Sequence, residues 1–194
     1  TVPVGTTQTI SEKLSDLCPN LSFPHETEEA DIHIAHSPER VLPGKVLTEL
    51  IENDRVIGGI SNTCGEKAAA LYKLLNIKGQ CLLTTAATAE LVKLSENAFR
   101  DVNIAFANEI SVICESLSIN PWEAINLANH HPRVNILQPG PGVGGHCIAI
   151  DPWFIVDSAP DSTELIRAAR KVNDAKPGYL ARKIITEASK QLAP

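Results

Sequence analysis

The 194-residue chain contains no methionine and no cysteine pair in a C-x-x-C arrangement. Its five cysteines, at positions 18, 64, 81, 114 and 147, are odd in number and do not fit a disulfide framework. We therefore expect reduced thiols and a cytoplasmic protein. Because methionine is missing and the opening TVPVGTT reads as the middle of a strand and turn, we also expect that the chain lacks its natural start.

The chain also lacks a basic run and a long apolar run. Its net charge is −6 and its pI about 5.5, so nucleic acid is not an expected partner. The apolar runs are too short to span a bilayer, and no basic-then-apolar leader is present, so we expect no membrane partner. Hydrophobic residues make up 43% of the chain, which is ordinary for a globular protein and sufficient for a core.

The first part of the sequence alternates short strand patterns with amphipathic helix patterns. Helices are predicted at 8–17, 44–53 and 65–77, and strands at 30–38, 54–60 and 80–86. This alternation predicts βαβ units and a parallel sheet.

From Thr88 onward the patterns are helical. Residues 88–118 contain neither proline nor glycine and predict one helix of about 47 Å, capped by Thr88. Further helices are predicted at 121–131 and at 161–190, the latter bent near Pro177. The predicted fold class is α/β: the second half of a parallel-sheet Rossmann-type domain over 1–87, then an all-helical central domain over 88–194.

A glycine-rich loop, LQPGPGVGGHCIAIDPWF, occupies residues 137–154. Gly140, Gly142 and Gly145 satisfy the dinucleotide fingerprint G-x-G-x-x-G, which needs a strand before it and a helix opening at its third glycine. Prolines interrupt the entry, and the residues after Gly145 are β-branched, aromatic and broken by Pro152, which makes a poor helix start. We therefore interpret the match as accidental.

The alternative is an irregular loop in which glycine lets the backbone approach a ligand and adopt positive φ. Cys147 would then lie at the floor of a cleft, with Asp151 four residues further on. A tight turn that leads to a buried, inert cysteine explains the same residues. Composition alone favours this second interpretation, because a free cysteine commonly behaves as a small hydrophobic residue, but the four glycines and two prolines before Cys147 leave both interpretations open.

Other polar residues form candidate ligand-binding groups. Lys93, Asn97, Arg100 and Asn108 fall within one stripe of the long helix, although a plain amphipathic helix also has a polar stripe. Glu39 and Arg40 follow a predicted strand, at the end where parallel sheets bind ligands.

The stretch HHPRVN, at residues 130–135, carries His131 and Arg133 as further candidates for binding a phosphate or a sugar, although an ordinary loop after a helix explains them as well. A metal site made from His130, His131, His146 and Cys147 lacks ligand spacing, so no metal is predicted.

Four stretches in this order, SPERVLPG, KLSENAFRDVNIAFANE, HHPRVNILQPGPGVGGHCIAIDPWF and ARKVND, resemble the nucleotide-sugar 6-dehydrogenases of the UDP-glucose and GDP-mannose dehydrogenase type. The resemblance covers essentially the whole chain. It implies a protein of three parts: an NAD domain, a central helical domain and a carboxy-terminal UDP-sugar domain. The chain would then lack the cofactor fingerprint and the last domain, and by itself it should not catalyse the reaction.

The resemblance implies a UDP-sugar substrate, NAD as cofactor, a homodimer formed through the central helices, and oxidation of the C6 alcohol to a carboxylate. Cys147 would be the nucleophile, and Lys93 and Asn97 would serve proton transfer and the oxyanion. Further implied roles belong to Asp151, which would orient Lys93 or water, and to Glu39, which would position water. Substrate contacts are implied for Arg40, Val41, Arg100, His131, Arg133 and Gly144. Cofactor contacts are implied for Thr1 and Thr7.

Overall fold

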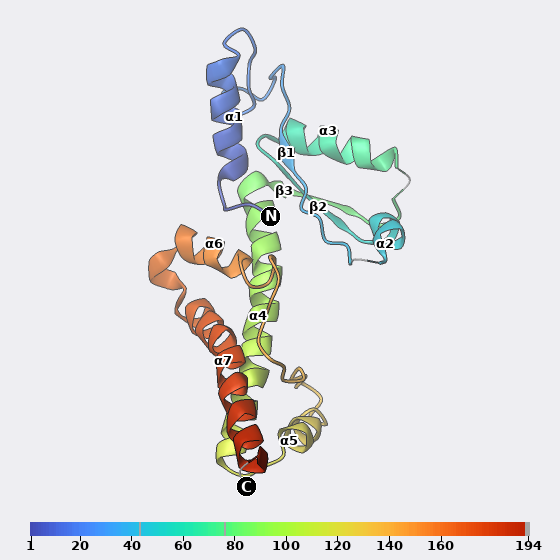
Figure 1. Cartoon of the computed structure of the whole chain (residues 1–194). Helices are drawn as coiled ribbons and strands as arrows, with labels where there is room; N and C mark the ends of the chain where they lie inside the picture. Colours follow the sequence, from blue (N-terminus) through green and yellow to red (C-terminus); the bar gives the residue numbers. More distant parts are fainter. Residues whose placement is uncertain (43, 76, 193–194) are drawn as a thin grey trace. The chain divides into compact units, whose positions relative to one another are not determined.

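The structure is a computed structural model of the chain, and it describes residues 1–42, 44–75 and 77–192. Pro43, in the PERVLPG stretch, and Asn76, near the end of the predicted helix 65–77, lie outside the described residues. The chain forms two compact units, Thr1–Ser95 and Glu96–Pro194, and helix α4 contributes residues to both (Figure 1). Each unit is described by itself below.

The first unit contains a three-stranded sheet of order β1-β2-β3, formed by Ala35–His36, Arg55–Gly59 and Cys81–Thr85. Strands β2 and β3 are parallel, as the alternation predicted, with Ile57 opposite Leu83. Every residue of β2 is buried, which agrees with its central position.

Strand β1 departs from the predicted parallel arrangement because it pairs antiparallel with β2. It is also shorter than the predicted strand 30–38, since only two of its residues pair with β2. A parallel return needs a crossover element packed on the sheet. Helix α2 (Val46–Glu52), which connects these strands, has seven residues and none of them is buried. The chain therefore returns to the sheet in the opposite direction.

Helix α3 (Asn62–Lys73) covers strands β2 and β3 (Figure 1). Its first turn is capped by the Ser61 hydroxyl, which accepts from the backbone N–H of Cys64. A side chain at Gly59 would place its Cβ 2.5 Å from the backbone nitrogen of Gly65. Glycine is therefore required where β2 meets the start of α3.

Helix α1 (Thr6–Leu17) confirms the predicted helix 8–17 and begins two residues earlier. Its start is attached to Glu90, whose carboxylate accepts from the backbone N–H groups of Gly5 and Thr7 and from the Thr7 hydroxyl at 2.5–2.7 Å. Glu90 is only 1% exposed, so three donors compensate for burying its charge.

Helix α4 (Ala86–Ser116) is the predicted long helix. The cap differs from the prediction, because Thr88 lies inside the helix and its backbone N–H donates to the hydroxyl of Thr85. The helix therefore starts directly after β3, with no loop between them. Position 85 takes the role of the cap because its hydroxyl is three residues before the free N–H group.

The second unit contains the rest of α4, helix α5 (Pro121–Ala128), helix α6 (Asp151–Ser158), a 3₁₀ turn (Pro160–Ser162) and helix α7 (Glu164–Leu192). Helices α5 and α7 confirm the predicted helices. The sequence does not predict helix α6, because Pro152 has the pattern of a break. Proline is tolerated in a first helical turn, where its missing N–H has no intrahelical partner, and that is where Pro152 lies.

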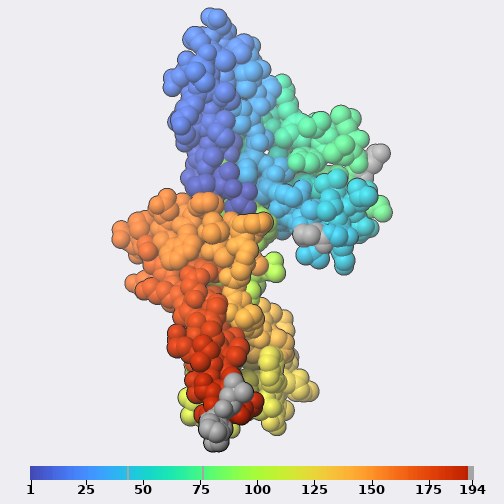
Figure 2. Space-filling view, viewed as in Figure 1, coloured from blue at the N-terminus to red at the C-terminus, as the bar shows by residue number. Residues whose placement is uncertain are grey.

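Helices α4 and α7 run side by side in the same direction (Figure 1), and side-chain hydrogen bonds join them. Arg170 bonds to Asp101 near one end, and Lys183 bonds to Glu115 near the other. The chain between the two helices returns through α5 and α6, so α7 can follow the direction of α4. Residues 181–191 of α7 are all exposed, and the red surface in Figure 2 belongs to this part of the helix.

Candidate functional site

Residues 137–150 of the glycine-rich loop contain neither helix nor strand. Two of the glycines, Gly142 and Gly145, have positive φ values of 114° and 84°, as the loop interpretation required. Helix α6 begins only at Asp151, six residues after Gly145, and no strand precedes the loop in the described part of the second unit. A dinucleotide fingerprint needs both elements, so the rejection of that interpretation agrees with the structure.

Cys147 is an exposed free cysteine, not a buried and inert one. Its sulfur lies 3.8 Å from Nδ1 of the neighbouring His146. Its carbonyl oxygen accepts from the backbone N–H groups of Ile150 and Asp151 at 3.0 and 2.8 Å. The backbone at the cysteine is thus held by the first turn of α6 while the thiol faces solvent, which suits a nucleophile that must reach a ligand.

Asp151 is 2% exposed and lies in the first turn of α6. Its Oδ2 accepts from Nδ2 of Asn97 at 2.5 Å, a buried contact between segments 54 residues apart. Asn97 and Asp151 are therefore two predicted catalytic residues that the structure joins through their side chains.

The other predicted residues of α4 have different surroundings. Lys93 is partly buried and belongs to the first unit, one helical turn before Asn97 and on the same face of α4. Arg100 is exposed. Asn108, by contrast, is completely buried and forms side-chain bonds inside the second unit. The predicted polar stripe is therefore not one uniform ligand-facing surface.

The PERV stretch in the first unit is organised by Glu39. Its Oε1 accepts from the backbone N–H groups of Arg40 and Val41 at 2.7 and 2.9 Å. Its Oε2 lies 3.7 Å from the Arg55 guanidinium. Arg40 donates to the carbonyl of Asp54. Glu39 is 58% exposed at its side chain and so remains accessible to water.

The predicted substrate contacts of the second unit are exposed: Arg100 lies on α4, and His131, Arg133 and Gly144 lie in loops. Nδ1 of His131 accepts from the backbone N–H of Arg133 at 3.3 Å, which fixes the imidazole beside the arginine. Gly144 is exposed, and a Cβ at that position would meet no atom within 4 Å. These residues are accessible, and the guanidinium of Arg133 suits an anionic ligand.

The two predicted cofactor contacts differ in accessibility. Thr1 is exposed. Thr7 is 6% exposed, and both its hydroxyl and its backbone N–H donate to Glu90. The Thr7 hydroxyl is thus already used inside the first unit. No pattern in the sequence predicts that Glu90 accepts these bonds.

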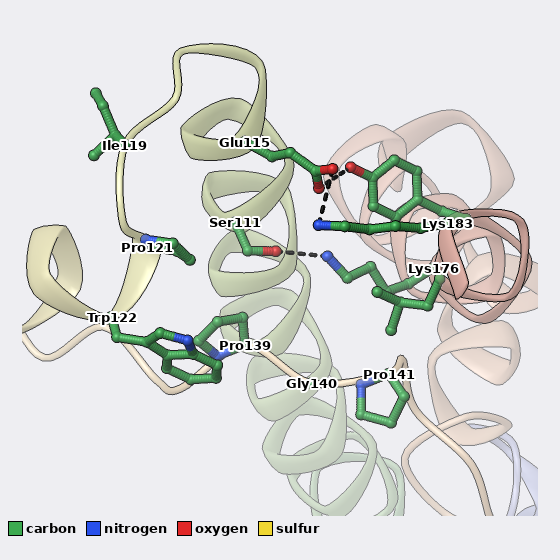
Figure 3. A pocket seen from close by; sticks show the side chains of 12 residues that line it. Ser111, Glu115, Ile119, Pro121, Trp122, Pro139, Gly140, Pro141, Lys176 and Lys183 are labelled. Carbon is green, nitrogen blue, oxygen red and sulfur yellow. Dashed lines mark hydrogen bonds and ion pairs between the residues drawn. The ribbon is translucent and has the colours of Figure 1, made fainter. Parts of the chain in front are cut away.

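A hollow of about 470 Å³ in the second unit does not include Cys147 (Figure 3). Helices α4 and α7 line it together with the loop entry around Gly140, and Lys176 donates to the Ser111 hydroxyl across it at 2.5 Å. Burial lowers the pKa of Lys176 below its usual value. Hydrogen bonds from Tyr179 and Lys183 lower the pKa of Glu115. The hollow thus lies at the start of the glycine-rich loop and not at its thiol.

A second hollow, of about 410 Å³, lies in the first unit at the carboxyl ends of β2 and β3. Gly59, Ser61 and Thr84 contribute to its lining, beside the start of α3. In α/β sheets this edge is where nucleotide ligands bind, and a helix start offers N–H groups to phosphate.

The described residues show neither a metal cluster nor a membrane-spanning helix. Within residues 1–42, 44–75 and 77–192, no group of three or more histidine, cysteine, aspartate or glutamate side chains is placed to hold a metal ion. In the same ranges, no helix is both long and apolar enough to cross a bilayer.

The molecule thus combines a sheet edge suited to nucleotides with helices that carry an exposed cysteine and a buried amide–carboxylate pair. Comparison with known proteins identifies the class. Residues 1–76 match the NAD binding domain of the UDP-glucose/GDP-mannose dehydrogenase family, and residues 87–175 match its central domain. The chain belongs to this family.

Several relatives in this family are similar over nearly the whole chain. An NDP-N-acetyl-D-galactosaminuronic acid dehydrogenase of Ralstonia nicotianae is 63% identical over 95% of the chain, and a UDP-N-acetyl-D-mannosamine dehydrogenase of Escherichia coli K12 is 59% identical over 93%. These matches cover 44% and 43% of the two relatives. The chain therefore spans less than half the length of the relatives it matches.

Solved structures show the same relationship. The structure of a UDP-D-ManNAc dehydrogenase from Pyrococcus horikoshii matches 98% of the chain with a TM-score of 0.88 and 43% identity, and the match covers 44% of that protein. An NDP-N-acetyl-D-galactosaminuronic acid dehydrogenase from Methanosarcina mazei matches 99% of the chain with a TM-score of 0.84 and 28% identity, over 42% of its own length.

Proposed function

We propose that this chain forms part of an enzyme that oxidises C6 of UDP-N-acetyl-D-mannosamine to the carboxylate with NAD. The observation that carries the proposal is the exposed Cys147, held at its backbone by α6 and followed by the Asp151–Asn97 pair, in a chain of the dehydrogenase family. Within this proposal, residues 1–87 are the later part of the NAD-binding domain and 88–194 are the central substrate and dimerisation domain.

The residues of the first unit fit part of an NAD molecule. The hollow beside Gly59 offers hydroxyl groups from Ser61 and Thr84 and the N–H groups at the start of α3. We assign these residues, with the exposed Thr1, to cofactor binding, and Thr7 to holding the Thr1–Gly5 turn through Glu90. NAD, when bound, would supply the capacity to accept hydride.

Cys147 has the central role in the proposed chemistry. After C6 has been oxidised to an aldehyde, the thiolate would attack it and form a thiohemiacetal. Loss of a second hydride would leave a thioester on the sulfur, and water would hydrolyse this bond to give the carboxylate and the free thiol. The overall oxidation removes four electrons, which corresponds to two molecules of NAD⁺ per sugar.

The neighbouring polar residues would handle protons and charge. Lys93 and Asn97, one turn apart on one face of α4, would stabilise the developing oxyanion, and Lys93 would transfer the proton. Asn97 uses one amide hydrogen for Asp151 and retains a second for this purpose. Glu39 would position the hydrolytic water.

The accessible cations would bind the nucleotide diphosphate. Arginine suits phosphate because its planar fork donates two parallel hydrogen bonds. We assign substrate contacts to Arg40, Val41, Arg100, His131, Arg133 and Gly144.

The test uses an enzyme that contains this chain at the length of its relatives. We expect two NADH per UDP-N-acetyl-D-mannosamine, and we expect Cys147→Ser to abolish production of the acid. Cys18→Ser changes another exposed free cysteine and should leave the rate unchanged. Acid production by Cys147→Ser at the parent rate would refute the nucleophile assignment. A panel with UDP-N-acetylgalactosamine and UDP-glucose decides the sugar, since one relative of 63% identity is named for a galactosaminuronic acid.

A second candidate function is dimerisation through α4. Phe99, Phe106 and Ile113 are 70%, 51% and 46% exposed, and they recur every seven residues along the helix. This spacing forms an apolar seam of the kind that pairs helices between chains. We propose that the seam joins two copies of the chain. Sedimentation should show a dimer that Phe106→Asp disrupts. Lys171→Asp should leave the dimer intact, because it changes an exposed residue of α7, and α7 packs against the opposite face of α4. A monomer at high concentration would exclude this role.

A further inference from the structure

Asn108 occupies an unusual place for an asparagine, because it is completely buried in the middle of α4. Asparagine is a weak helix former, and burying its amide without partners is unfavourable. Both ends of the amide are used here. Its Oδ1 accepts from the backbone N–H of Gly140 at 2.8 Å, and its Nδ2 donates to Oδ1 of Asn173 at 2.9 Å. The residue thus joins the glycine-rich loop to helix α7.

The bonds continue in one direction to a buried charge. Nδ2 of Asn173 donates to the carboxylate of Asp101 at 2.8 Å, and that carboxylate is paired with Arg170 at 2.6 Å. The direction is fixed at both ends, because a backbone N–H can only donate and an ionised carboxylate can only accept. Hydrogen bonds aligned in this way polarise and strengthen one another.

Pro177 provides a second attachment for the loop. Proline has no N–H, so it cannot donate to the carbonyl oxygen of Asn173 four residues earlier in α7. Gly142 occupies the space beside that oxygen: a Cβ at Gly142 would lie 2.7 Å from it and 3.0 Å from Cδ of Pro177. The loop backbone is therefore seated against α7 two residues after the bond to Asn108.

The far end of the loop returns to the same face of α4. The carbonyl of Cys147 accepts from the backbone N–H of Asp151, whose side chain accepts from Asn97. Asn97 and Asn108 are eleven residues apart, which corresponds to three turns and about 16 Å along one helical face. Two asparagines of one helix thus hold the two ends of the segment that carries the thiol. Figure 3 shows Gly140 between Pro139 and Pro141 in the loop.

We propose that Asn108 is a positioning residue for Cys147. It does not touch the thiol; it fixes Gly140, and with Asn173 it determines where the loop enters and hence where the sulfur is presented. The inference rests on the proposed function only in giving Cys147 a reaction to perform. The attachment itself can be measured without turnover.

The first test measures the attachment in this chain by NMR. Asn108→Ala removes the acceptor for Gly140, and we expect the Gly140 amide to exchange with solvent at least about fivefold faster. We also expect the His146 and Cys147 amide resonances to shift. Asn103→Ala is the matched control, because its side chain bonds to the Phe99 carbonyl of its own helix. Unchanged exchange at Gly140, or unchanged resonances at Cys147, would overturn the proposal.

Asn108→Asp tests independently whether Asn108 is the acceptor for Gly140, in case Asn108→Ala does not fold. It keeps an oxygen facing Gly140 but has no amide hydrogens for Asn173. We expect Gly140 exchange within about twofold of the parent rate in this variant. Exchange as fast as that expected for Asn108→Ala would contradict the assignment of Asn108 as the Gly140 acceptor.

The second test uses the active enzyme that contains this chain. We expect Asn108→Ala to lower kcat at least about tenfold while KM changes less than about threefold, because the thiol is misplaced and, of the assigned substrate contacts, only Gly144 lies in the displaced segment. An equal effect of Asn103→Ala would overturn the positioning role. If the parent enzyme does not oxidise any nucleotide sugar, the proposed function fails, and the exchange measurements still decide the attachment.

Discussion

Asn97 donates its side-chain amide to the buried carboxylate of Asp151 over 2.5 Å, and this bond joins the long helix to the helix that follows the cysteine loop. Hydrogen bonds to charged groups contribute more than neutral ones, about 1.5–3 kcal/mol. A double-mutant cycle of Asn97→Ala and Asp151→Ala should therefore give a coupling energy of about 2 kcal/mol in urea unfolding. Both tryptophans, Trp122 and Trp153, belong to the second unit and report its unfolding. A coupling near zero would refute the bond.

Gly142 offers a test of the backbone at the loop entry. Gly142→Ala requires an L-residue at φ 114° and brings a Cβ to 2.7 Å from the Asn173 oxygen. We expect a loss of about 1–3 kcal/mol in the stability of the second unit. The matched control is Gly144→Ala, which meets no neighbour within 4 Å and has no positive φ. Equal tryptophan-monitored unfolding curves for the two variants would contradict the observed seating of the loop.

The Arg170–Asp101 pair is buried on both sides, each side chain being 1% exposed. Arg170→Met leaves the carboxylate without its cation and should destabilise the second unit by about 3–5 kcal/mol. Arg167→Met provides the same chemical change at a residue that donates to a backbone carbonyl in an exposed contact. We expect that control to lose at most about 1 kcal/mol. Denaturant unfolding distinguishes the two variants. Similar losses of unfolding free energy would show that the buried pair stabilises the unit no more than an exposed contact does.

Because of His36, we expect the stability of the first unit to depend on pH. Burial lowers the pKa of His36 below its usual value, against a smaller opposite effect from Glu90. The unfolded chain therefore binds a proton at a higher pH than the folded chain does. The stabilisation that arises from this difference in pKa is fully present above pH 6.5, the usual pKa of histidine. It is lost as the pH falls from there through the lowered pKa of His36.

His36→Gln should remove this loss. Thermal unfolding followed by circular dichroism between about pH 5 and 8, the range in which histidine changes its charge, should show the parent and the variant diverging as the pH falls, with the parent losing more stability. Parallel curves for the two proteins over this range would contradict the prediction.

Local patterns were sufficient for most of the secondary structure. The long proline-free and glycine-free stretch of 31 residues predicted α4 nearly in full, because apolar residues at helical spacing indicate a helix wherever it packs. The same reasoning missed α6, where Pro152 looked like a break and was a first-turn residue. It also missed the antiparallel pairing of β1, since strand direction depends on whether the connecting helix packs on the sheet.

The sequence likewise predicted some features of the candidate site and missed others. The density of glycine and proline before Cys147 predicted an irregular loop with positive φ, and the structure has one. The sequence placed Asn97, Arg100 and Asn108 in a single polar stripe, yet one of them is exposed and two are buried with different partners. Burial of a polar side chain is set by whatever packs over it, and periodicity does not contain that information.

By itself, the sequence determined the alternating elements of the first unit, the long helix, the cysteine loop and the motifs that mark a nucleotide-sugar dehydrogenase. Only the tertiary structure decided that Asp151 faces Asn97 and that Gly140 and Asn173 share Asn108. The physical reason is the range of the interactions. Helix and turn preferences act over a few residues, whereas these hydrogen bonds join positions 32 to 65 residues apart and exist only once the helices have packed.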